Sequence, residues 1–113
     1  MKRLLPVLFL LMAACKSKTI EIPKGIIAKE KMKAILTDIH VADAVAETKA
    51  QAGMDEKLLT EEYHQQIFKN HHITYEEFTN SFKFYEANPK LMDEVYNDIL
   101  NELTKREAQA AKN

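Results

Sequence analysis

The sequence predicts an all-α protein, a small four-helix domain in which a long first helix packs against three shorter ones. The first observation is composition: the 113 residues include only two glycines and three prolines, whereas Ala, Glu, Lys and Leu, which favour helices, are abundant. The second is that apolar residues recur every three or four positions, as on one side of a helix. The third is that helix start and stop signals divide the chain into four such segments.

The N-terminal segment has the layout of a cleaved signal peptide. Lys2 and Arg3 precede the apolar run 4–12, which has about half of the roughly 20 residues that a membrane-spanning helix needs. The run ends in Leu11-Met12-Ala13-Ala14-Cys15, which resembles the lipobox of bacterial lipoproteins, with Met12 in place of the usual leucine. The resemblance implies cleavage before the cysteine and a covalent diacylglycerol and acyl anchor on that residue, with no other cofactor. The alternative is an ordinary secretory signal with a chance cysteine.

These features divide the chain into three parts. Residues 1–14 are the lipoprotein signal peptide, residues 15–27 the lipidated cysteine and its tether, and residues 28–113 the helical domain. We therefore expect the protein in the cell envelope, attached to a membrane through Cys15. The tether carries no acidic cluster of the kind that accompanies surface export in Bacteroidota-type bacteria, which favours the outer membrane, facing the periplasm.

Charge and cysteine content narrow the classes of function. Removal of residues 1–14, with their two basic side chains, leaves 99 residues with 14 basic and 17 acidic side chains, a net charge of −3. The sequence contains no basic patch, so no nucleic-acid partner is expected. The chain has a single cysteine, so no disulfide can form within the domain and the fold depends on its apolar core.

The first helix is predicted to span Lys29 to Ala52 and to end at Gly53, in the position of a left-handed cap. Asp43 falls within its apolar stripe, and His40 lies at the edge of the stripe one turn earlier, so their side chains could meet. The stripe comprises Met32, Ile35, Leu36, Ile39, Ala42, Ala46 and Ala50.

Three further helices follow. Thr60 is predicted to cap the second helix, which runs to about His71, where one residue takes the conformation that glycine usually provides. The pattern Thr74-Tyr75-Glu76-Glu77 predicts a capping box at the start of the third helix. Asn88-Pro89 ends that helix and begins the fourth. The fourth helix is expected to fade into a polar tail after Leu103.

His40 and Asp43 form a candidate buried polar site, because a carboxylate on an apolar stripe needs a partner. They could be an acid/base pair or two metal ligands, or Asp43 could simply be satisfied structurally, by His40 or a tyrosine hydroxyl. No metal site is predicted, since His64 and His71 lie seven residues apart, about 10 Å along a helix, too far for adjacent ligands. No catalytic nucleophile or phosphate-binding loop is predicted either. The candidate tyrosines are Tyr63, Tyr85 and Tyr96.

A second candidate is an apolar patch for a partner protein. Val41 and Val45 fall on the otherwise polar face of the first helix, and Phe84 points away from the buried edge of the third. If these residues cluster, they could bind a partner. The alternative is that a four-helix domain buries two sides of some helices.

Blocks of residues across nearly all of the mature chain resemble an uncharacterised lipoprotein domain family of the Bacteroidota. The family implies a small helical lipoprotein of unknown function. The matching blocks are 29–32, 38–44, Tyr63, 67–69, 73–74, Phe78, Tyr85, Pro89, Met92, Tyr96 and Leu103.

These observations favour a non-enzymatic function. We expect a membrane-tethered interaction or assembly-accessory domain, with an unidentified envelope protein as its partner. One alternative is a chaperone-like holder of unfolded envelope proteins. Another is a small metal-binding or ligand-binding protein, or an enzyme, centred on His40 and Asp43.

Overall fold

The structure, a computed structural model, describes residues 20–112 and contains four helices and, within that range, no strand. The prediction of an all-α four-helix domain is confirmed. The predicted signal peptide and Cys15 lie outside the described residues. The helices are α2 (Lys29–Gln51), α3 (Glu56–Asn70), α4 (Tyr75–Glu86) and α5 (Pro89–Lys112), with 23, 15, 12 and 24 residues.

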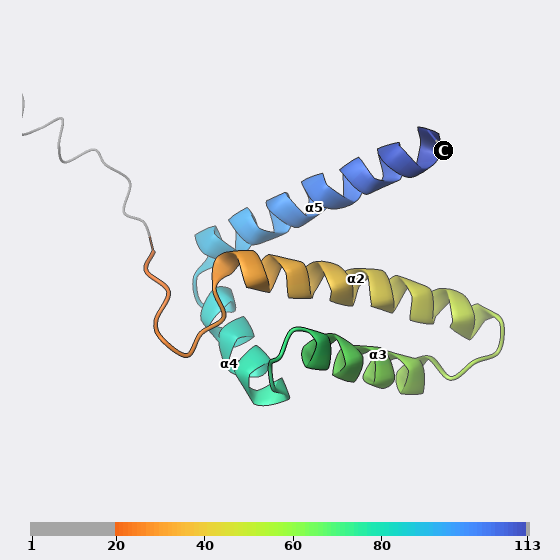
Figure 1. Cartoon of the computed structure of the whole chain (residues 1–113), viewed down its shortest axis with the longest axis horizontal. Coiled ribbons are helices and arrows are strands. Elements are labelled where there is room, and N and C mark those ends of the chain that lie inside the picture. The colour runs from red at the N-terminus through yellow and green to blue at the C-terminus, as the bar shows by residue number, and fades with distance from the viewer. Residues whose placement is uncertain (1–19, 113) are drawn as a thin grey trace, which may run out of the picture.

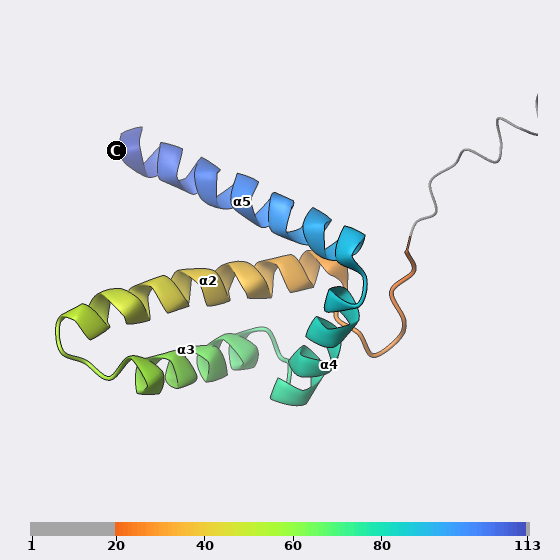
Figure 2. The same ribbon diagram turned by 180° about the vertical axis from the view of Figure 1, so that it is seen from behind.

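Helix α2 is the centre of the arrangement. Helix α3 runs back antiparallel along one side of α2, and α5 lies on the other side, while the short α4 crosses one end and links α3 to α5 (Figure 1). The view from behind shows the same order and also shows that α5 diverges from α2 toward its C-terminus (Figure 2). The packing of α2 is more extensive on α3 than on α5.

The C-terminus of α2 confirms the predicted glycine cap. Gly53 has φ 99°, the left-handed conformation that glycine adopts without steric cost. Its N–H donates to the Ala50 carbonyl at 3.0 Å, and the Met54 N–H donates to the Lys49 carbonyl at 3.2 Å. These two bonds satisfy carbonyls that the end of a helix otherwise leaves free.

Helix α3 begins one turn earlier than predicted. The Asp55 carboxylate accepts a hydrogen bond from the Leu58 N–H at 3.2 Å, so Asp55 is the N-cap and Thr60 lies inside the helix. The prediction of Thr60 was wrong because a carboxylate at a helix N-terminus also gains from the helix dipole. The predicted C-terminus is confirmed: the helix ends at Asn70 and His72 has φ 57°.

The starts of α4 and α5 are as predicted, but their polar contacts differ. The Thr74 hydroxyl accepts from the Glu77 N–H at 3.0 Å and donates to the Glu77 carboxylate at 3.4 Å, so that carboxylate meets the hydroxyl rather than the Thr74 amide. The Asn88 side-chain amide donates to the Phe84 carbonyl at 2.7 Å. Asn88 therefore caps the end of α4 with its side chain, and α5 begins at Pro89.

Helix α5 continues through Lys112, so the prediction of a polar tail after Leu103 was wrong, and α5, with 24 residues, is one residue longer than α2. No glycine or proline follows Pro89, and the residues after Leu103 are mainly Ala, Glu, Lys, Arg and Gln, which favour helix even without apolar periodicity. A Glu102–Arg106 ion pair at 3.4 Å gives this part local support.

The core gathers at the end of the molecule where α4 crosses. It joins the first half of α2, the end of α3, the first half of α5, one residue of α4 and the residue Ile27 before α2. The far halves of α2 and α5 contribute little to it. The core consists of Ile27, Met32, Ile35, Leu36, Ile39, Ile67, Phe68, Ile73, Tyr85, Leu91, Val95 and Ile99.

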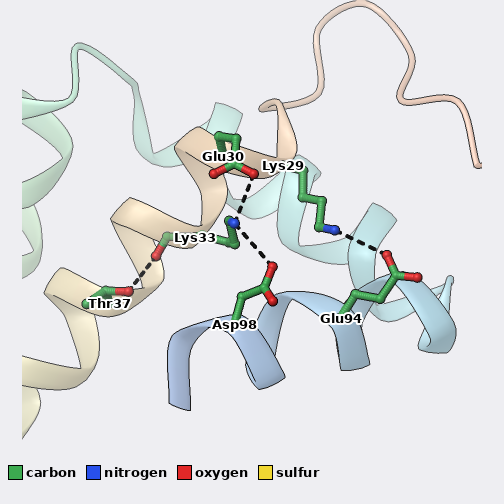
Figure 3. Close-up of polar contacts among 6 residues, drawn as sticks. All are labelled: Lys29, Glu30, Lys33, Thr37, Glu94 and Asp98. Atoms are coloured by element: carbon green, nitrogen blue, oxygen red, sulfur yellow. Dashed lines mark hydrogen bonds and ion pairs between the residues drawn. The ribbon is translucent and has the colours of Figure 1, made fainter. Parts of the chain in front are cut away.

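Ion pairs join α2 to α5 near this same end. Lys29 contacts Glu94 at 3.2 Å, and Lys33 contacts Asp98 at 3.1 Å and Glu30 at 2.9 Å (Figure 3). All of these contacts lie in the first halves of the two helices. The two helices are therefore tied at one end and separate toward the other.

Candidate functional site

The most exposed apolar feature of α2 is a ridge formed by Val41 and Val45. The two residues lie one helical turn apart and are 43% and 41% exposed, as predicted for that face. By helix periodicity they lie opposite the buried stripe of α2, and α5 diverges from α2 toward its C-terminus (Figure 1). The ridge is therefore uncovered within the described residues.

Two hollows flank the ridge. The first has a volume of about 370 Å³ and lies toward α3, with Ala42, Tyr63 and Ile67 in its walls. The second has a volume of about 630 Å³ and lies toward α5, with Ala44 and Leu103 in its walls. Val41, Val45 and Arg106 line both.

An apolar ridge between two hollows is suited to packing another helix. Helices pack by placing side-chain ridges into the grooves of a neighbour, and the residues of a ridge follow an i, i+4 row such as Val41 and Val45. We call this ridge and its two hollows the docking face. Its polar margin consists of Asp38, His40, Thr48, Lys49, Gln66, Arg106 and Glu107.

Phe84 does not belong to the docking face. Its ring is half-buried, packs against the core, and meets the Tyr85 ring edge-on at a centroid distance of 5.7 Å. It lines neither hollow. The expectation that Phe84 points away from the core and joins the two valines was wrong, because α4 crosses the other end of α2 and contacts α5 there.

None of the partners considered for Asp43, His40 among them, is the one found. His40 is exposed, and its ring lies 5.8 Å from the Tyr96 ring. Asp43 instead accepts a hydrogen bond from His64 Nε2 on α3, at 2.7 Å. Asp43 is only half-buried, since 47% of its side chain is exposed.

A second pair of the same kind joins α2, about one turn before Asp43, to the residue that follows α3. His71 Nε2 donates to the Asp38 carboxylate at 2.7 Å, so two Asp–His contacts bridge the antiparallel helices α2 and α3. The structure thus pairs Asp43 with His64, and His71 with Asp38, which was not predicted as a site residue. No sequence signal pairs them, because the partners lie on different helices. Among the described residues no three His, Cys, Asp or Glu side chains gather as a metal site.

These contacts bridge α2 and α3, and their contribution to stability can be measured. We expect Asp43→Ala and His64→Ala each to lower the free energy of unfolding by about 1 kcal/mol or less, because both side chains are partly exposed. The double variant should lose less than the sum of the two single losses. Urea denaturation checks this, with Glu61→Ala, at an exposed position of α3, as the control. Additive losses would contradict a direct interaction.

A buried polar clamp at the start of the domain was missed by the sequence analysis. The Ile27 N–H donates to Ser81 Oγ at 2.9 Å, and the Tyr85 hydroxyl donates to the Ile27 carbonyl at 2.7 Å. Both side chains are fully buried and stand one turn apart on α4. They fix the backbone where the predicted tether joins α2.

None of the three tyrosines considered as partners of Asp43 contacts it through its hydroxyl. The Tyr85 hydroxyl donates to the Ile27 carbonyl. The Tyr63 hydroxyl accepts from Lys49 Nζ at 2.8 Å, and the Tyr96 ring faces His40. The partner of Asp43 is a histidine instead.

The raised pKa values of two side chains lead us to expect a loss of stability at alkaline pH. Hydrogen bonds to Glu30 and Asp98 raise the pKa of Lys33 above its ordinary 10.5, and burial raises the pKa of Tyr85 above its ordinary 10.0. Both groups bind a proton more tightly in the folded than in the unfolded chain. Their contribution to stability is therefore complete below pH about 10 and is lost as pH rises through the raised pKa values.

Urea denaturation between pH 8 and 11 measures this loss. Tyr85→Phe, which cannot ionise, should have a lower free energy of unfolding at pH 8 but a shallower decline above pH about 10. An equal decline in the wild type and in Tyr85→Phe would show that Tyr85 does not contribute to the alkaline loss.

The sequence was compared with models of known protein families. A family model described as "Domain of unknown function (DUF4296)" matches residues 23–109. The chain belongs to the DUF4296 family. This confirms the resemblance to a domain family of unknown function, and the DUF4296 match includes the clamp, both Asp–His contacts and the docking face. Comparisons with curated proteins and with solved structures found no match. In the described part of the chain, no helix has the length and apolar character needed to cross a membrane.

Proposed function

We propose that the protein is a lipid-anchored, non-enzymatic interaction domain of the cell envelope, facing the periplasm from the outer membrane. Its docking face binds one helix of a partner protein. The observation that carries the proposal is the Val41–Val45 ridge, exposed between two hollows on the central helix. The proposed anchor is the diacylglycerol and acyl group on Cys15, which follows an apolar run and two small residues.

The position of the docking face suits an anchored protein. The described chain arrives at the start of α2, next to α4, whereas the space between α2 and α5 widens toward the opposite end (Figure 2). The 13 residues from Cys15 to Ile27 could span roughly 40 Å if they were fully extended. Such a tether leaves the docking face clear of the membrane surface.

The clamp supports the same proposal. A tether passes any pull on the anchor or on a bound partner to the residues that join the tether to the domain. Ser81 and Tyr85 bind those residues through two buried hydrogen bonds to Ile27. The junction between tether and domain is thus held by side chains of the core, not only by the first turn of α2.

A crosslinking experiment in the native envelope tests the function. The full-length protein is crosslinked in cells and purified, and the wild type is compared with Val41→Glu/Val45→Glu. The control is Met54→Glu/Leu58→Glu, which places the same charges on residues that are 51% and 55% exposed outside the docking face. We expect a defined crosslinked product in the wild type and the control and its loss in the ridge variant. Equal products in all three would contradict the proposal.

A further inference from the structure

The end of α5, residues 100–112, is a helical segment with almost no packing of its own. We call it the arm. Ile99 is the last buried residue of α5, and every residue of the arm except Leu103 is exposed. Helices in proteins gain most of their stability from the packing of an apolar side. The arm would therefore be stabilised by closing on an apolar surface within its reach.

The second hollow is such a surface, and it lies between the arm and α2. Leu103, Arg106 and Glu107 of the arm form one of its walls, and the ridge residues Val41 and Val45 belong to the other. The hollow lies where α5 diverges from α2 (Figure 2). Movement of the arm toward α2 would fill this hollow and remove apolar surface of both walls from water.

Contacts at the other end of the two helices hold the base of the arm in place. Ion pairs join Lys29 to Glu94 and Lys33 to Asp98 (Figure 3). Helix α5 contains no glycine, and its one proline is its first residue. Sharp kinks in helices usually need such residues. The arm would therefore tilt and curve toward α2 as one continuous helix.

The arm carries a suitable side for this closure. At 100° for each residue, Leu103, Arg106 and Ala110 lie within about 40° of Ile99, so they continue the buried side of α5 beyond the core. An arginine covers apolar surface with its methylene stem while its charged head stays in water. Ala108 lies on the opposite side of the arm.

We propose that the arm is a lid of the docking face, which closes over the second hollow and keeps a partner helix out. In the closed form the apolar residues of the arm pack on Val41 and Ala44. The open arrangement is the form that accepts a partner (Figure 1). The inference rests on the proposed function, because it concerns the regulation of the same face. Closure lowers the apparent affinity for a partner in proportion to the fraction of open chains.

An engineered disulfide in the full-length protein, in its native envelope, tests the closure. Thr48 lines the α2 wall of the hollow, and Ala110 lies one turn beyond Arg106 on the closing side of the arm. The Cα atoms of a disulfide lie within about 7 Å of each other. Thr48→Cys/Ala110→Cys should therefore form an intrachain disulfide when the arm closes.

The matched control is Thr48→Cys/Ala108→Cys, which also replaces an alanine of the arm but on the opposite side. After mild oxidation of the cells, mass spectrometry of unreduced peptides identifies the link between the introduced thiols and separates it from any link to Cys15. We expect the disulfide in the first variant and its absence in the control. No disulfide in the first variant, or equal yields in the two, would overturn the inference.

The locked chain then tests whether closure keeps a partner out. Oxidised Thr48→Cys/Ala110→Cys should lose the crosslinked product of the wild type, and reduction before crosslinking should restore it. Ala110→Lys, whose charge the closed form would bring to the hollow beside Lys49, should raise the yield of product above that of the wild type. Ala108→Lys should leave the yield unchanged. A locked chain with the full yield of product would overturn the inference.

The outcomes separate this inference from the proposed function. If the disulfide forms but the locked chain keeps its product, the arm does not regulate the docking face, and the proposed function stands. If the ridge variant Val41→Glu/Val45→Glu keeps the product of the wild type, the proposed function fails, and the regulatory role of the arm fails with it whatever the yield of disulfide.

Discussion

Replacement of Tyr85 by alanine is expected to leave the domain largely unfolded. Tyr85 is fully buried, and truncation of a buried aromatic side chain costs about 3–5 kcal/mol. The change also leaves the Ile27 carbonyl without its partner, which adds the cost of a buried unsatisfied acceptor. The two terms sum to about 4–8 kcal/mol. Total stabilities of single domains start at about 5 kcal/mol, so this loss can equal the whole stability of a small domain.

Two milder variants separate the ring from the hydrogen bonds. Tyr85→Phe keeps the ring and should lower the free energy of unfolding by about 1–3 kcal/mol, and Ser81→Ala, which frees the Ile27 N–H, should act similarly. Urea denaturation followed by circular dichroism measures all three. Tyr75→Ala, at a tyrosine that is 73% exposed, is the control and should lose little. Equal losses for Tyr85→Ala and Tyr75→Ala would contradict the clamp.

Replacement of Cys15 by alanine is expected to abolish lipid attachment completely. The proposed anchor is covalent and uses the sole cysteine, so no other thiol can replace it. The wild type should incorporate labelled fatty acid and have an intact mass that lacks residues 1–14 and includes the lipid. The variant should incorporate no fatty acid and should not be processed before residue 15.

Ser17→Ala is the matched control for this change, because it replaces a small residue two positions later and leaves the cysteine in place. It should be labelled and processed as the wild type is. Equal labelling of Cys15→Ala and the wild type would show that the lipid is attached elsewhere or that the label is not covalent.

The sequence predicts those parts of the fold that depend on neighbours along the chain. Gly53 ends α2 because its left-handed backbone is a local property, and Thr74 caps α4 because its partner is three residues away. The extent of α5 was underestimated for a related reason. Apolar periodicity stops after Leu103, but helix propensity does not, and the helix follows propensity.

Features that depend on tertiary pairing were not predictable from one sequence. His64 meets Asp43 only because α3 folds back antiparallel on α2, and two helix periodicities do not fix which residues face each other. Ser81 and Tyr85 bind a backbone segment more than 50 residues earlier, and a serine has no sequence signal for such a role. The exposure of Val41 and Val45 was predicted correctly because it follows from periodicity on one helix.

A photocrosslinking amino acid at position 45 of the full-length protein, in its native envelope, tests the central claim most directly. The same amino acid at Leu58, which is 55% exposed outside the docking face, is the reference. A docking face predicts a defined crosslinked product from position 45, whether to a second copy or to another envelope protein, and none from position 58. No product from position 45, or the same products from both positions, would contradict the claim that the Val41–Val45 ridge binds a helix.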